Sequence, residues 1–174
     1  MDASTQLLLD EVRRAMHHTK ALGDAALGQL REEDWHRKVG GEDNTVAIIV
    51  RHMHGNMVSR WTDFLNSDGE KPDRNRDAEF ETSLETGAEL RRLWEDGWQI
   101  VFDAIDPLTP EHLRAEVLIR SQPHTVARAL LRQVTHYAEH VGQIVLLAKH
   151  FRGDDWQTLS IPKRRESSSG TDSP

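Results

Sequence analysis

Four long segments of this chain repeat their apolar residues at steps of three and four, which is the period of one face of an α-helix. They cover about residues 4–30, 45–66, 78–105 and 125–151, and Asn44 or Thr45 is the expected N-cap of the second. No strand-rich region and no internal repeat accompanies them. Because each helix must bury its apolar face against another, the pattern predicts an all-α fold, a four-helix bundle.

The connections between these segments are polar and carry glycine or proline. Between the third and fourth segments, DPLTPEHL predicts a short extra helix or turn, and EVLIRSQPHT predicts an extended excursion around Pro123. Residues 1–162 are expected to form a single domain. Residues 163–174 are rich in serine and without period, so we expect a disordered polar tail.

Composition excludes several classes of function. A net charge of -7 is the opposite of a nucleic-acid-binding footprint, so no nucleic acid partner is expected. The chain has no cysteine, which removes disulfides and thiolate ligands, and any metal must be bound by nitrogen and oxygen atoms. The start of the sequence resembles neither a signal peptide nor a membrane span, so a cytoplasmic protein without membrane contact is expected.

His136 and His140 are four residues apart in the last helical segment, which places both imidazoles on one helix face. That spacing suits two ligands of one metal ion, although two histidines can also share a face by chance. Tyr137, Val141 and Ile144 make this helix half-buried. Unpaired imidazoles are costly in such a place, and metal binding would satisfy both.

Two ligands leave a metal incompletely coordinated, so a third should come from a facing helix. The second segment offers His52 and His54, which differ by about 200° around the helix and cannot both point inward. His52 lies between Ile49 and Met53 on the apolar side, and we select it as the ligand. His54 falls on a more polar flank and is expected to face solvent or to lie behind a ligand.

Two blocks of sequence resemble the signature regions of an uncharacterised branch of the DinB/YfiT-like superfamily of four-helix metal-dependent proteins. They are IIVRHMHGNMVSRWTDFLNSDGEKPDRNRDAEFE and RQVTHYAEHVGQIVLLAKHFRGDDWQTLSIP, and the resemblance covers residues 7–162. It implies a four-helix bundle whose ligands fall on His52, His136 and His140. It also implies zinc or nickel with open coordination positions and a low-molecular-weight thiol as cosubstrate. The ending KRRESSSG departs from the glycine-containing, ordered end expected after LSIP, which puts any role of the tail in doubt.

Three neutral histidines leave a divalent ion with its full charge and with room for substrate, which is the catalytic arrangement of ligands. This arrangement predicts a metal-dependent enzyme, and the resemblance implies that it transfers a low-molecular-weight thiol to an electrophilic small molecule. One alternative is a binding or stress-related module in which the metal is structural, and another is a metal-free helical scaffold. Glu139 points about 100° away from His140, so the arrangement of a zinc peptidase is absent. No catalytic residue is assigned.

Asn56, Arg60 and Gln143 extend the faces that carry the histidines and are expected to line a pocket or to orient ligands. A buried ion pair for Arg60 and an interhelical hydrogen bond for Gln143 are the alternatives. Trp61, Trp94 and Trp98 are expected in the core. The charged loop 67–77 receives no chemical role and is expected to be a solvated face or a dimer contact. A homodimer formed through an apolar helix face is expected.

Overall fold

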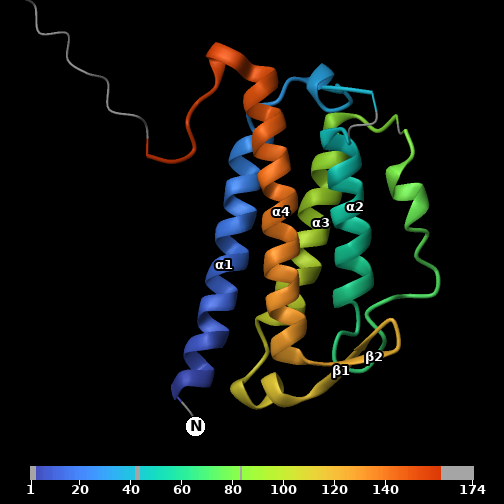
Figure 1. Cartoon of the computed structure of the whole chain (residues 1–174), viewed down its shortest axis with the longest axis vertical. Coiled ribbons are helices and arrows are strands. Elements are labelled where there is room, and N and C mark those ends of the chain that lie inside the picture. Colours follow the sequence, from blue (N-terminus) through green and yellow to red (C-terminus); the bar gives the residue numbers. More distant parts are fainter. Residues whose placement is uncertain (1–2, 42–43, 83, 162–174) are drawn as a thin grey trace, which may run out of the picture.

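The computed structural model describes residues 3–41, 44–82 and 84–161. Within these residues lie four α-helices: α1 (Ala3–Leu27), α2 (Val46–Trp61), α3 (Gly87–Ile105) and α4 (Val126–Arg152). They stand side by side with their long axes nearly aligned (Figure 1). The expectation of a mainly helical fold is confirmed.

Shorter elements complete the described part of the chain. Four 3-10 turns are η1 (Glu32–Asp34), η2 (Asp77–Phe80), η3 (Pro110–Arg114) and η4 (Gly153–Asp155). Strands β1 (Glu116–Ile119) and β2 (Gln122–Thr125) pair antiparallel and form a hairpin at one end of the helices (Figure 1). The short helix and the extended excursion expected between the third and fourth helices correspond to η3 and to this hairpin.

Threonine side chains start three of the helices. The hydroxyl of Thr45 accepts the backbone N–H of Ile48, and the hydroxyl of Thr125 accepts the N–H of Arg128. At α3, Thr86 forms a reciprocal capping box with Glu89. These bonds satisfy N–H groups that have no partner in the first turn, which is why each helix begins where it does.

The periodicity predicts that the third helix begins near residue 78, but in the structure it begins at Gly87. Leu84, which falls within the segment expected to be helical, is 95% exposed. The cause is the strong cap at Thr86, together with η2, which draws residues 77–80 back onto α2. The prediction of a helix from the apolar spacing before Gly87 was therefore wrong.

The second helix ends at Trp61 rather than near residue 66. Thr62 is extended and Asp63 has a φ of 50°, so the backbone leaves the helical region there. The hydroxyl of Ser67 donates to the carbonyl of Asp63 at 2.9 Å and closes the turn. The first helix likewise ends at Leu27, earlier than residue 30.

The apolar faces of the four helices meet in one continuous core. Trp61, Trp94 and Trp98 are all buried in it, as predicted. Among the described residues, no helix is both long and apolar enough to cross a bilayer. The predicted disordered tail, 163–174, lies outside the described residues.

Candidate metal centre

The three histidines selected from the sequence come together between α2 and α4. His52 projects from α2, and His136 and His140 project from successive turns of α4. One ring nitrogen of each lies within 4.8 Å of the corresponding atoms of the other two. The ring centres are 4.9 Å apart for His52 and His140, and 4.6 Å apart for His136 and His140. This cluster could hold a metal ion.

His52 is buried, and one of its two ring nitrogens, Nδ1, has a carboxylate partner. Nδ1 lies 2.9 Å from Oε2 of Glu79, a residue of η2. The ring of Phe80 packs against the same imidazole with a centroid separation of 4.8 Å. With Nδ1 occupied, Nε2 is the nitrogen left for an ion.

The two histidines of α4 also have one nitrogen each without a protein partner. Nδ1 of His140 lies 3.3 Å from Oε1 of Gln143, which leaves its Nε2. Nε2 of His136 is buried and has no hydrogen-bond partner within the described part of the chain. A buried nitrogen without a partner is costly. The donor set therefore fits a cation that accepts imidazole nitrogen, such as zinc.

The pKa values favour the neutral, metal-binding form of the α4 pair. Burial, followed by charge on His140 and His52, lowers the pKa of His136 from 6.5 to about 3. Burial, followed by charge on His52, also lowers the pKa of His140. Both rings are therefore neutral at pH 7, with a lone pair available for a metal.

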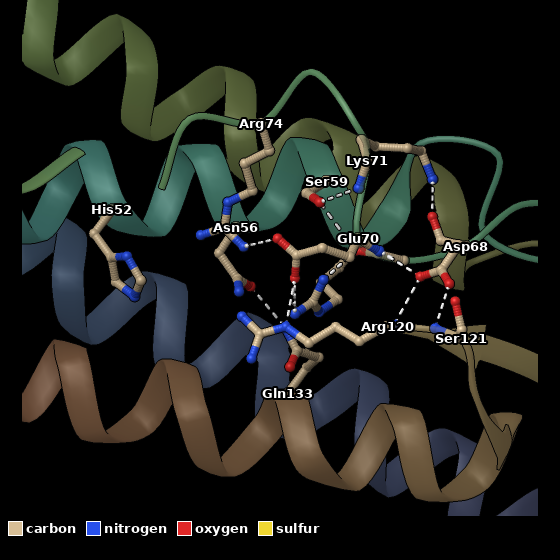
Figure 2. Close-up of polar contacts among 12 residues, drawn as sticks. His52, Asn56, Ser59, Asp68, Glu70, Lys71, Arg74, Arg120, Ser121 and Gln133 are labelled. Carbon is tan, nitrogen blue, oxygen red and sulfur yellow. Dashed lines mark hydrogen bonds and ion pairs between the residues drawn. The ribbon is translucent and has the colours of Figure 1, made fainter. Parts of the chain in front are cut away.

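A chain of ion pairs runs from Glu79 of η2 to the hairpin, and Figure 2 shows the part of it that joins Arg74, Glu70 and Arg120. Arg74 donates to both oxygens of Glu79, at 2.8 and 2.9 Å. Glu70 in turn accepts from Arg60 and from Arg120, each at 3.0 Å. The loop 67–77 thus connects the metal cluster to the β1–β2 turn, although the sequence analysis assigned it no chemical role.

Glu79 is an ionised carboxylate in this setting. Burial alone would raise its pKa, but hydrogen bonds from His52 and Arg74, together with the charge of Arg74, bring the pKa below its usual range. Sequence reasoning missed this residue. The one signal was Phe80, an isolated aromatic residue beside it in an otherwise polar stretch.

Asn56 and Arg60 lie farther along α2, away from the imidazoles. The side-chain oxygen of Asn56 accepts from Gln133 at 2.7 Å and from the hydroxyl of Tyr137 at 3.1 Å. Arg60 donates to the carbonyl of Gly69 and to Glu70. Within the described residues neither has a hydrogen bond to the three histidines. Arg60 therefore takes the alternative considered for it, a buried ion pair.

His54 is separate from the cluster. Its Nε2 lies 2.9 Å from Oδ2 of Asp96, so it joins α2 to α3. Its side chain is partly exposed, in keeping with its more polar flank.

A cleft of about 430 Å³ lies beside Gln143, the residue that contacts His140. It lies between α4 and the segment that leads into α2. Its lining is mostly apolar: Val39, Asn44, Ile49, Gln143, Leu146, Leu147 and His150. Gln143 belongs both to the lining and to the surroundings of His140, so the cleft adjoins the cluster.

The family model described as "Protein of unknown function (DUF1572)" matches residues 3–165. The chain belongs to this family. The DUF1572 match spans all four helices and includes the three histidines. No curated protein and no solved structure matches the chain. Since the description of DUF1572 names no activity, function must be argued from the site.

Proposed function

We propose that this DUF1572 protein is a metal-dependent enzyme with a DinB/YfiT-like four-helix bundle. His52, His136 and His140 bind one divalent ion, zinc or nickel, and the enzyme transfers a low-molecular-weight thiol to an electrophilic small molecule. The observation that carries the proposal is the meeting of three imidazoles from two helices, each with a nitrogen within 4.8 Å of the others. The resemblance to that superfamily supports the choice of metal and of thiol.

The ligand set supports a catalytic ion over a structural one. Structural zinc sites use four protein ligands, whereas catalytic sites use three and keep a position for water or substrate. The described residues supply three. Beside them lies a cleft of about 430 Å³, within the usual range for small-molecule sites.

A bound divalent ion supplies Lewis acidity, which lowers the pKa of a coordinated thiol or water. The protein's own residues hold and orient the reactants. Neutral histidines leave the positive charge of the ion uncompensated, which favours thiolate over thiol. Because the chain has no cysteine, the thiol comes from outside. Gln143 stands where its amide can hydrogen-bond a group that enters from the cleft, and the apolar lining suits the body of the electrophile.

A structural role for the metal is the second candidate. The cluster joins α2 to α4, so an ion there would hold the two helices together even without an open position. The two candidates differ in whether a small thiol can enter the coordination sphere.

The first experiment measures metal content and affinity in protein purified without a histidine tag. After chelation, we expect zinc, nickel or cobalt to bind with a stoichiometry of one. His136→Ala should weaken binding at least tenfold, and the matched control His18→Ala, an exposed histidine of α1, should leave it unchanged. Absence of stoichiometric binding in the wild type would refute the metal centre.

The second experiment uses the absorption spectrum of the cobalt form. A small thiol should produce a thiolate-to-cobalt charge-transfer band if a coordination position is open. Thiols are then screened against electrophiles, and His136→Ala should abolish any transfer. If thiols leave the spectrum unchanged, the ion has a structural role and the proposed enzymatic function is wrong.

A further inference from the structure

Glu79 reaches His52 from a different part of the chain. It lies 27 residues after His52 in sequence, yet η2 packs against α2 and brings Oε2 to 2.9 Å from Nδ1. Side-chain exposure is 7% for His52 and 10% for Glu79, so water competes little for this contact. The pairing is thus enclosed by protein.

Gly55 makes room for the carboxylate. It lies one turn after His52 on α2, next to the side chain of Glu79. A Cβ at this position would lie 2.8 Å from Cδ of Glu79 and closer still to Oε1. Any larger residue would therefore push the carboxylate away from the imidazole.

Arg74 also holds this carboxylate. Its guanidinium donates to both oxygens of Glu79, and its side chain is 6% exposed. Such a two-pronged contact fixes the plane of a carboxylate as well as its distance. Glu79 is therefore oriented before any ion enters.

We propose that Glu79 is a positioning residue for the metal centre. Its carboxylate accepts the Nδ1–H of His52, which selects the tautomer with a lone pair on Nε2 and turns that atom toward His136 and His140. Gly55 and Arg74 are the parts of the protein that make this possible. Ligand histidines are commonly held by a carboxylate in this way. The inference rests on the proposed metal centre, which it extends by these three residues.

The competing explanation is that Glu79 and Arg74 form an ion pair that only fastens loop 67–80 to α2. The two explanations differ in what the folded protein does. A fastening pair changes the free energy of unfolding, whereas a positioning carboxylate also changes the metal affinity of the protein that remains folded.

The test uses the full chain and the isosteric substitution Glu79→Gln, with Asp77→Asn as the matched control. Asp77 belongs to the same η2 turn, and its side chain is 96% exposed. Affinity for zinc is measured by competition with a chromophoric chelator, after circular dichroism has shown equal helix content. We expect Glu79→Gln to bind about 10–100-fold more weakly, and Asp77→Asn to bind as the wild type does.

Gly55→Ala supplies a second, independent disturbance of the same contact. It should also weaken zinc binding. Because both substitutions act through one contact, the double variant should lose no more affinity than the weaker-binding single variant. Fully additive losses would contradict the proposed arrangement.

A measurement on the wild type keeps the proposal testable if a variant fails to fold. Nitrogen-15 NMR of labelled histidine, with zinc bound, should show His52 protonated at Nδ1 and bound to metal through Nε2. Coordination through Nδ1 would overturn the positioning role. If the wild type binds no ion, the proposed function fails; if it binds and Glu79→Gln binds equally well, the positioning role alone fails.

Discussion

The indole N–H of Trp61 donates a hydrogen bond of 2.8 Å to the hydroxyl of Tyr137, and so joins α2 to α4 in the core. Tyr137 follows the ligand His136 directly, and its hydroxyl also contacts Gln133 and Asn56. This buried polar network closes the space between the two helices below the histidines.

Substitution Tyr137→Phe is expected to lower the free energy of unfolding by about 1–3 kcal/mol. It removes the hydroxyl that accepts from Trp61 and leaves that indole N–H without its buried partner. Urea denaturation of the metal-free protein measures the change. Thr135→Ala, an exposed position on the same helix, is the control and should stay within about 0.5 kcal/mol. Equal stability of both variants would mean that the network contributes nothing.

Two helical glycines should respond to alanine in opposite directions. A Cβ at Gly23 of α1 would lie 2.5 Å from Cη2 of Trp94, so Gly23→Ala should destabilise by about 1–3 kcal/mol through overpacking. At Gly142 of α4, apart from its chain neighbours and the backbone of its own helix, no atom of the described residues lies within 4 Å of such a Cβ. Gly142→Ala should therefore stabilise the protein by up to about 1 kcal/mol. Thermal unfolding of the pair, with the wild type beside them, gives the comparison.

The stability of the metal-free protein should depend on pH through His136. Its pKa is about 3 in the folded protein against the ordinary value of 6.5, so the unfolded chain binds more protons between these values. The stability from this group is fully present above about pH 6.5 and is lost as the pH falls toward 3. The urea concentration at the midpoint of unfolding should fall between pH 7 and pH 4, and it should fall less steeply in His136→Gln than in the wild type. A slope identical to that of the wild type would contradict the lowered pKa.

Asp68 is expected to hold the hairpin turn to loop 67–77. Its carboxylate accepts the backbone N–H groups of Arg120 at 2.9 Å and of Ser121 at 2.6 Å. Burial opposes the charge of Asp68, but these bonds and the N–H of Glu70 lower its pKa on balance. Asp68→Asn should cost about 1–3 kcal/mol and speed hydrogen exchange at Ser121. Asp73→Asn, an exposed neighbour in the same loop, should change neither.

The helices and the candidate ligands could be predicted because they depend on local spacing. The step of four between His136 and His140 determines that they share a face in any helix. The choice of His52 over His54 followed from the apolar neighbours of His52, and the structure places His52 in the cluster and His54 against Asp96. Thr45 was recognisable as a cap because its hydroxyl acts within its own turn.

Glu79 could not be predicted in this way because its partner is 27 residues away and the intervening loop has no regular period. The start of α3 was misplaced for a related reason, since Phe80 and Leu84 match a helical spacing that the cap at Thr86 overrides. Asn56 does share the face of His52, as predicted, but Gln133 and Tyr137 occupy its side-chain oxygen.

The four helical segments, their apolar faces and the imidazoles that share a face could be read from the amino-acid sequence, since each follows from residues within a turn or two. The meeting of α2 and α4 at these histidines, the cleft near them and the contact of Glu79 with His52 became visible only in the folded chain. Those features depend on the path of loops and on packing between distant segments, for which the chain carries no local pattern.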